Sequence, residues 1–84
     1  MRKIILDGSV MTGREALHDA LCAQLALPEH YGRNLDAMYD CLTAMPETEI
    51  ELRNWPQAGY LARALDVMRD AAEDNILLRI TVVQ

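Results

Sequence analysis

Residues 27–42, LPEHYGRNLDAMYDCL, contain a loop followed by a helix, and the rest of the chain is interpreted outward from them. Pro28 and Gly32 are typical loop residues, and Gly32 can take the positive φ that lets a chain turn sharply. Asn34 is a good helix N-cap, so we expect a helix from there to about Ala44. Its apolar residues recur at helical spacing and predict the buried face: Leu35, Met38, Leu42 and Met45.

The segments on either side of this stretch alternate between strand and helix patterns. Strands are predicted at residues 2–7, about 48–53 and 76–83, and further helices at about 12–26 and 57–73. Thr12 is expected to cap the first helix, with Glu15 as its capping-box partner. Residues 4–6 are consecutive apolar residues, which suits a strand covered on both faces.

The element order is β-α-α-β-α-β. Strands separated by helices require crossover connections, and these produce parallel pairing. The sequence therefore predicts an α/β fold with a small three-stranded parallel sheet and helices packed against it.

The length and composition fit a small globular protein. Eighty-four residues and 9.5 kDa predict one domain over residues 1–84. Thirteen acids against eight bases give a net charge of −5, which argues against binding to nucleic acid or to an anionic membrane. That charge suits a cationic partner, although acidity also serves solubility alone. With no signal-peptide pattern or apolar run of membrane-spanning length, we expect a cytoplasmic protein.

The predicted helix after Asn34 carries an acidic patch. Asp36 and Asp40 are four residues apart, so both carboxylates lie on one face, away from the apolar stripe. Asp36 is also explained as a stabiliser of the first helical turn, whereas Asp40 lies mid-helix, where Asp is a poor helix former. The neighbours of this patch are polar or aromatic: His30, Tyr31, Tyr39 and Thr43.

Other polar residues have simpler explanations. Asp66, Asp70 and Glu73 share a helix face, which is solvated by default, and His18 is expected on the exposed side of its helix. Cys22 and Cys41 are expected to be reduced and mostly buried. No metal site or cofactor is expected.

Enzyme chemistry is the least favoured interpretation. A small hydrolase would pair His30 with Cys41 or with Asp36 as base and nucleophile or as acid and base. The chain has no phosphate-binding glycine loop and no hydrolase or zinc-protease motif. Cys41 lies at the flank of the apolar stripe, where a core thiol is the simpler explanation.

Across residues 27–42 the chain resembles the barstar family, intracellular inhibitors of the ribonuclease barnase, and the element order extends this likeness over the whole chain. The resemblance implies that the loop and the following helix block the active site of a basic ribonuclease. Asp36 and Asp40 match the two acids of the inhibitory helix, with Asp40 expected in the enzyme's phosphate site. Gly32 matches a loop glycine, Asn34 and Ala37 match helix-start residues, and Asp70 matches a peripheral interface acid.

The chain departs from the family pattern at three interface positions. His30 stands where the family has tyrosine, Tyr39 where it has tryptophan, and Arg33 where it has an acid. We therefore expect a non-enzymatic inhibitor with an antitoxin or immunity role, in a 1:1 complex with a barnase-like ribonuclease or a toxin encoded nearby. The alternative is a barstar-like module that binds another cationic protein without inhibiting a ribonuclease. The expected partner-binding residues are His30, Tyr31, Gly32, Arg33, Asn34, Asp36, Ala37, Tyr39, Asp40, Thr43 and Asp70.

Overall fold

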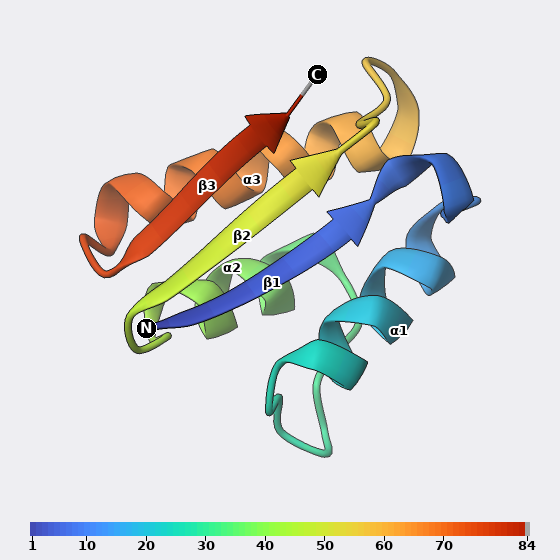
Figure 1. The fold of residues 1–84 in the computed structure, drawn as a ribbon. Helices are drawn as coiled ribbons and strands as arrows, with labels where there is room; N and C mark the ends of the chain where they lie inside the picture. Colours follow the sequence, from blue (N-terminus) through green and yellow to red (C-terminus); the bar gives the residue numbers. More distant parts are fainter. Residues whose placement is uncertain (84) are drawn as a thin grey trace.

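Three parallel strands form the centre of the protein (Figure 1). The computed structural model describes residues 1–83 and places β1 (Arg2–Asp7), β2 (Thr48–Arg53) and β3 (Leu78–Val83) in the order β1-β2-β3. The register aligns Ile4 with Ile50 and Ile50 with Ile80, so these side chains fall in one row of the sheet. The predicted α/β fold and parallel sheet are confirmed. The last strand begins two residues later than expected because Ile76 lies in the preceding turn and is 96% exposed.

All three α-helices lie on the same side of the sheet. They are α1 (Arg14–Gln24), α2 (Leu35–Thr43) and α3 (Gly59–Asp74), and a short 3-10 helix, η1 (Gly8–Val10), follows β1. The strands are in sequence order, so two right-handed crossovers both pass over one face. Figure 1 shows α2 and α3 behind the sheet and α1 beside β1.

The other face of the sheet has no helix over it. The prediction that β1 is covered on both faces is wrong, because Ile4 and Leu6 are buried while Ile5 is 42% exposed. Charged side chains occupy this open face. Glu51, at the centre, lies 3.1 Å from Lys3 and also pairs with Arg53, and these two hydrogen-bonded cations hold the pKa of the Glu51 carboxyl below its usual value.

The first helix begins differently from the capping box expected at Thr12. Its N-cap is Gly13, which makes no side-chain hydrogen bond to the helix. Gly13 has φ 148° and ψ −147°, a conformation open essentially only to glycine. The backbone requirement for glycine therefore took precedence over the side-chain cap, and α1 starts at Arg14.

The core lies between the sheet and the helices. Met38 and Leu42 of α2 and Met68 of α3 are fully buried with strand residues such as Ile50 and Leu52. No helix within residues 1–83 has the length and apolarity needed to cross a membrane. The expected single domain over residues 1–84 includes a last residue outside the described range, and it stays a prediction.

Candidate functional site

The two acids of α2 are held outward by the packing of the opposite face of the helix. The Asn34 Oδ1 accepts a hydrogen bond of 2.7 Å from the Ala37 N–H, so the expected N-cap is confirmed. Met38 and Leu42 each retain only 1% exposure and fix which side of α2 faces the core. Leu35 and Met45 are half-buried and complete the predicted apolar stripe.

Asp36 and Asp40 are both exposed, as predicted. Within residues 1–83 neither carboxylate takes part in an ion pair. Thr43, one turn after Asp40, donates its hydroxyl to the Asp40 carbonyl oxygen at 3.0 Å. Two like charges therefore stand on one helix face without a compensating cation, and only Asp36, in the first turn, interacts favourably with the dipole of α2.

The end of α2 is fixed by Asn75, a residue from the far side of α3 in the sequence. Asn75 is 8% exposed, and its Nδ2 donates to the Leu42 and Met45 carbonyl oxygens, both at 3.0 Å. Its Oδ1 accepts from the Leu77 N–H at 3.0 Å. This one side chain satisfies carbonyls at the end of α2 and ties them to the turn before β3.

The sharp turn before α2 occurs at Arg33 and not at Gly32, contrary to the prediction. Arg33 has φ 54°, whereas Gly32 is not among the residues with positive φ. Gly32 matters through space instead, because a Cβ there would lie 3.2 Å from the Ala37 Cβ and 3.3 Å from the Asn34 Nδ2. The loop thus passes close to the first turn of α2.

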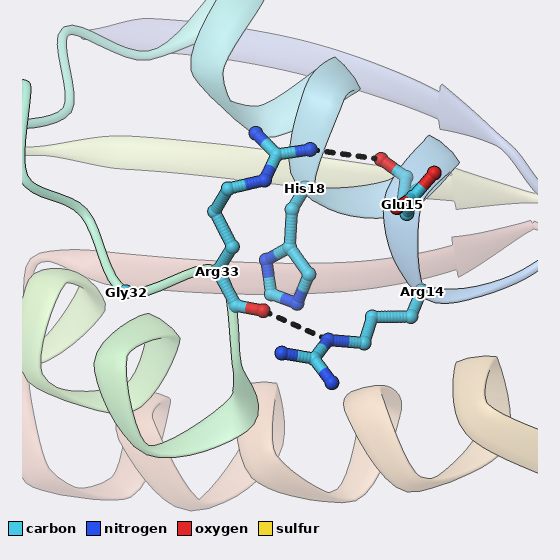
Figure 2. Close-up of a pocket in the computed structure, with 5 residues that line it drawn as sticks. All are labelled: Arg14, Glu15, His18, Gly32 and Arg33. Atoms are coloured by element: carbon cyan, nitrogen blue, oxygen red, sulfur yellow. Dashed lines mark hydrogen bonds between the residues drawn. The ribbon is translucent and has the colours of Figure 1, made fainter.

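Arg33 is tied back to α1. Its guanidinium pairs with the Asp19 carboxylate and donates to the Glu15 carbonyl oxygen at 3.5 Å. Its own carbonyl oxygen accepts from the Arg14 Nε at 3.0 Å, and Figure 2 shows both of these backbone-carbonyl contacts. The hydrogen bond to Asp19 is the main cause that raises the Arg33 pKa. The charge of Arg33 is therefore balanced within the protein.

Tyr31 belongs to the core and not to the open surface of the loop. It is 9% exposed, and its hydroxyl lies 2.7 Å from the His18 Nδ1. The His18 Nε2 lies 2.8 Å from the hydroxyl of Tyr60 on α3. Burial raises the Tyr31 pKa. The His18 ring therefore links the loop before α2 to both α1 and α3.

His18 itself corrects the expectation of an exposed side chain, because it is fully buried. Burial is the first cause that lowers its pKa, followed by the charges of Arg33 and Arg14. The sequence did contain a signal. His18 precedes Leu25 by seven residues, and positions seven apart on a helix share nearly the same direction.

The remaining expected site residues occupy different environments. Tyr39 is half-buried, and its hydroxyl donates to the Asp74 carboxylate on α3. His30 is exposed in the loop, and Asp70 is exposed on α3, which packs against α2. The structure thus joins the loop and α2 into one continuous segment and leaves Asp70 on the neighbouring helix.

The thiols offer no support for hydrolase chemistry. Cys41 is half-buried against the core, and burial raises its pKa, whereas a nucleophilic cysteine needs a lowered one. Cys22 is exposed, so the expectation that both thiols are mostly buried is wrong for this one. Within residues 1–83 no three metal-ligating side chains cluster.

A shallow apolar groove of about 370 Å³ adjoins Asp40. Residues 26–28 before the loop form one wall, and Cys41 together with residues 44–46 forms the other. A carboxylate beside an apolar groove can bind a cation while a neighbouring apolar side chain of the same partner is buried.

Comparisons with known proteins point to one family. A family model described as Barstar (barnase inhibitor) matches residues 1–82. A Bacillus subtilis (strain 168) protein, YrdF, is 42% identical over 81 residues, covering 88% of this chain and 89% of that protein. Its name describes it as a candidate ribonuclease inhibitor.

Proposed function

Because the chain belongs to the barstar family, we propose that it is a protein inhibitor that blocks the active site of a basic ribonuclease with α2 and the preceding loop. The observation that carries this proposal is the pair Asp36 and Asp40, exposed on one face of an anchored helix and without an ion-pair partner in residues 1–83. The name of the Bacillus subtilis relative supports the same role.

The chemistry of the two carboxylates fits a phosphate-binding groove. A ribonuclease holds cationic side chains where RNA phosphates bind, and a carboxylate can form the same charge-assisted hydrogen bonds. A net charge of −5 adds long-range attraction toward a basic enzyme and raises the association rate. We assign Asp40 to the phosphate site and Asp36 to a neighbouring cation.

The other members of the proposed surface act in two ways. We propose that some contact the partner directly: His30, Gly32, Asn34, Asp36, Ala37, Asp40 and Asp70. Others form a hydrogen bond or an ion pair within the protein, so part of their role is to hold the surface in place: Tyr31, Arg33, Tyr39 and Thr43.

The inhibitor performs no chemistry in this proposal. It forms a 1:1 complex in the cytoplasm, and its target is barnase-like or a toxin encoded nearby, consistent with an antitoxin or immunity role. A buried area of about 1,600 Å² in total is typical of such complexes. A module that binds another cationic protein through the same acids is the alternative outcome of the test.

The test is a ribonuclease inhibition titration with three proteins: the wild type, Asp40→Ala and Glu49→Ala. The two variants each remove one negative charge, but Glu49 lies in β2 on the open face of the sheet. The targets are barnase and any ribonuclease encoded beside the gene. Asp40→Ala should weaken inhibition by about 3 kcal/mol or more, roughly a hundredfold, because it leaves enzyme cations unpaired.

That magnitude is typical of close charge pairs in the barnase–barstar complex itself. Glu49→Ala should inhibit within about twofold of the wild type, because surface changes away from an interface have small effects. An Asp40→Ala variant that binds within threefold of the wild type would contradict the assignment of the site. A wild type that inhibits neither enzyme would favour the module that binds another cationic protein.

A further inference from the structure

A pocket of about 400 Å³ lies between the start of α1 and the loop before α2 (Figure 2). Arg14, Glu15, His18, Gly32 and Arg33 line it. The Arg14 Nε donates to the Arg33 carbonyl oxygen at 3.0 Å, and this bond fixes the direction of the guanidinium. Within residues 1–83 Arg14 forms no ion pair, so its terminal nitrogens remain available to a ligand.

Arg14 opposes the local stability of its own helix. It is the first residue of α1, where the helix dipole favours negative charge and disfavours positive charge. Gly13 adds no side-chain cap there. A residue that conflicts with its local structure is expected at functional sites, where another interaction accounts for it.

The neighbouring charges leave Arg14 as the uncompensated cation of the pocket. Arg33 is balanced by Asp19, and Glu15 lines the pocket without forming an ion pair with Arg14. Figure 2 shows the Arg14 side chain extending toward the Arg33 carbonyl and away from Glu15. Burial first, and then the charges of Arg33 and Arg14, lower the pKa of His18, and the part due to the arginines is in the direction expected for positive charge near the pocket.

Arg14 also contacts the loop that leads into the acidic surface of α2. The carbonyl that it contacts belongs to Arg33, and the next residue, Asn34, caps the helix that carries Asp36. A partner that covers Gly32 and Asp36 therefore reaches the mouth of the pocket as well.

We propose that Arg14 is a cationic contact of the inhibitory interface and binds a carboxylate of the partner ribonuclease. This inference rests on the proposed function and adds a requirement to it: the target combines a basic active site with an acidic side chain near its edge. A single carboxylate fits the one uncompensated cation. An RNA chain fits less well, because the loop that lines the pocket leads directly into the helix that carries Asp36 and Asp40, whose charges repel phosphates.

Charge reversal at Arg14 separates this local contact from general electrostatics, because the two predict opposite signs. A more acidic inhibitor should bind a basic enzyme faster and more tightly if only the overall field matters. If Arg14 binds a carboxylate, Arg14→Glu should instead weaken binding about tenfold or more through faster dissociation, because like charges then face each other. The experiment measures association and dissociation rates of Arg14→Glu against a ribonuclease that the wild type inhibits.

The matched control is Arg79→Glu, an exposed position on β3 that also forms no ion pair within residues 1–83. It should bind as the wild type does or slightly more tightly. Arg14→Glu favours the dipole of α1 but loses the hydrogen bond to the Arg33 carbonyl oxygen, so its urea midpoint should stay close to that of the wild type. An unchanged midpoint excludes unfolding as the cause of weak binding.

Three other outcomes would overturn the inference. Tighter binding by Arg14→Glu, with Asp40→Ala still weakened, would overturn the Arg14 contact and leave the proposed function intact. Binding of a short RNA oligomer by the wild type, lost in Arg14→Glu, would replace the carboxylate with a phosphate. A wild type that inhibits no ribonuclease overturns both proposals together.

Discussion

Replacing the buried His18 by leucine tests the link between the helices and the loop. The two hydroxyls bonded to its ring, at 2.7 and 2.8 Å, would lose their partners. The Tyr31 hydroxyl is buried, so it incurs a desolvation cost of about 1–3 kcal/mol, whereas Tyr60 is half-buried and can reach water. We expect His18→Leu to lower the free energy of unfolding by about 2 kcal/mol at pH 7.5, measured by urea denaturation.

The pH dependence of the stability lost in His18→Leu provides a second test. Burial first, then Arg33 and Arg14, lower the His18 pKa below its ordinary value of 6.5, while Asp19 opposes this shift. His18 therefore binds a proton more readily in the unfolded chain than in the folded one. The stabilisation by neutral His18 is fully present above about pH 6.5 and is lost as the pH falls through the pKa of His18 in the folded state. Leucine cannot titrate, so the stability gap between wild type and variant should narrow from pH 7.5 to pH 5.

A double variant isolates the unpaired hydroxyl as the cause. His18→Leu combined with Tyr31→Phe removes both partners of one hydrogen bond, so the double variant should be less destabilised than the sum of the two single variants. Stability curves of wild type and His18→Leu that run parallel from pH 5 to pH 7.5, or diverge on acidification, would refute the reasoning.

Two further predictions concern the ends of α2, each read from a urea midpoint. Asn75→Ala removes three hydrogen bonds worth about 1 kcal/mol each, so the free energy of unfolding should fall by about 3 kcal/mol. A loss below about 1 kcal/mol would mean that water replaces these hydrogen bonds. Asn34→Ala removes the N-cap and should cost about 1 kcal/mol, whereas Asn34→Gly, which also loses the side chain, should cost only a few tenths. Equal losses in the two Asn34 variants would argue against the cap as the cause.

The elements that the sequence predicted well depend on local patterns. The strand at residues 48–53 alternates along its own length, and Asn34 caps a helix whose first turn lies within three residues. The resemblance of residues 27–42 to a known family predicted the family that the comparisons show, and the expected exposure of Asp36 and Asp40 on α2 is confirmed. Short-range periodicity and a motif of sixteen residues were sufficient for these.

The residues that the sequence analysis misplaced or passed over have their partners far along the chain. His18 bonds to side chains 13 and 42 residues away, and the Asn75 side chain reaches carbonyls 33 and 30 residues away. The helical spacing of apolar residues indicates which face of a helix is buried, but it does not predict that a histidine on that face forms hydrogen bonds with two tyrosines. The position of Arg33 is equally nonlocal, because its turn is secured by contacts with α1.

The tethers of the loop also determine when the chain loses its conformational freedom. Tyr31 is held through His18, and Arg33 through α1, before any partner arrives. The entropy of ordering these residues is therefore lost during folding and is not subtracted from the affinity. The Arg33 contact with Asp19 is exposed, whereas Tyr31 and His18 are buried, so warming should loosen the Arg33 side of the loop first and weaken binding of the proposed partner before the fold melts.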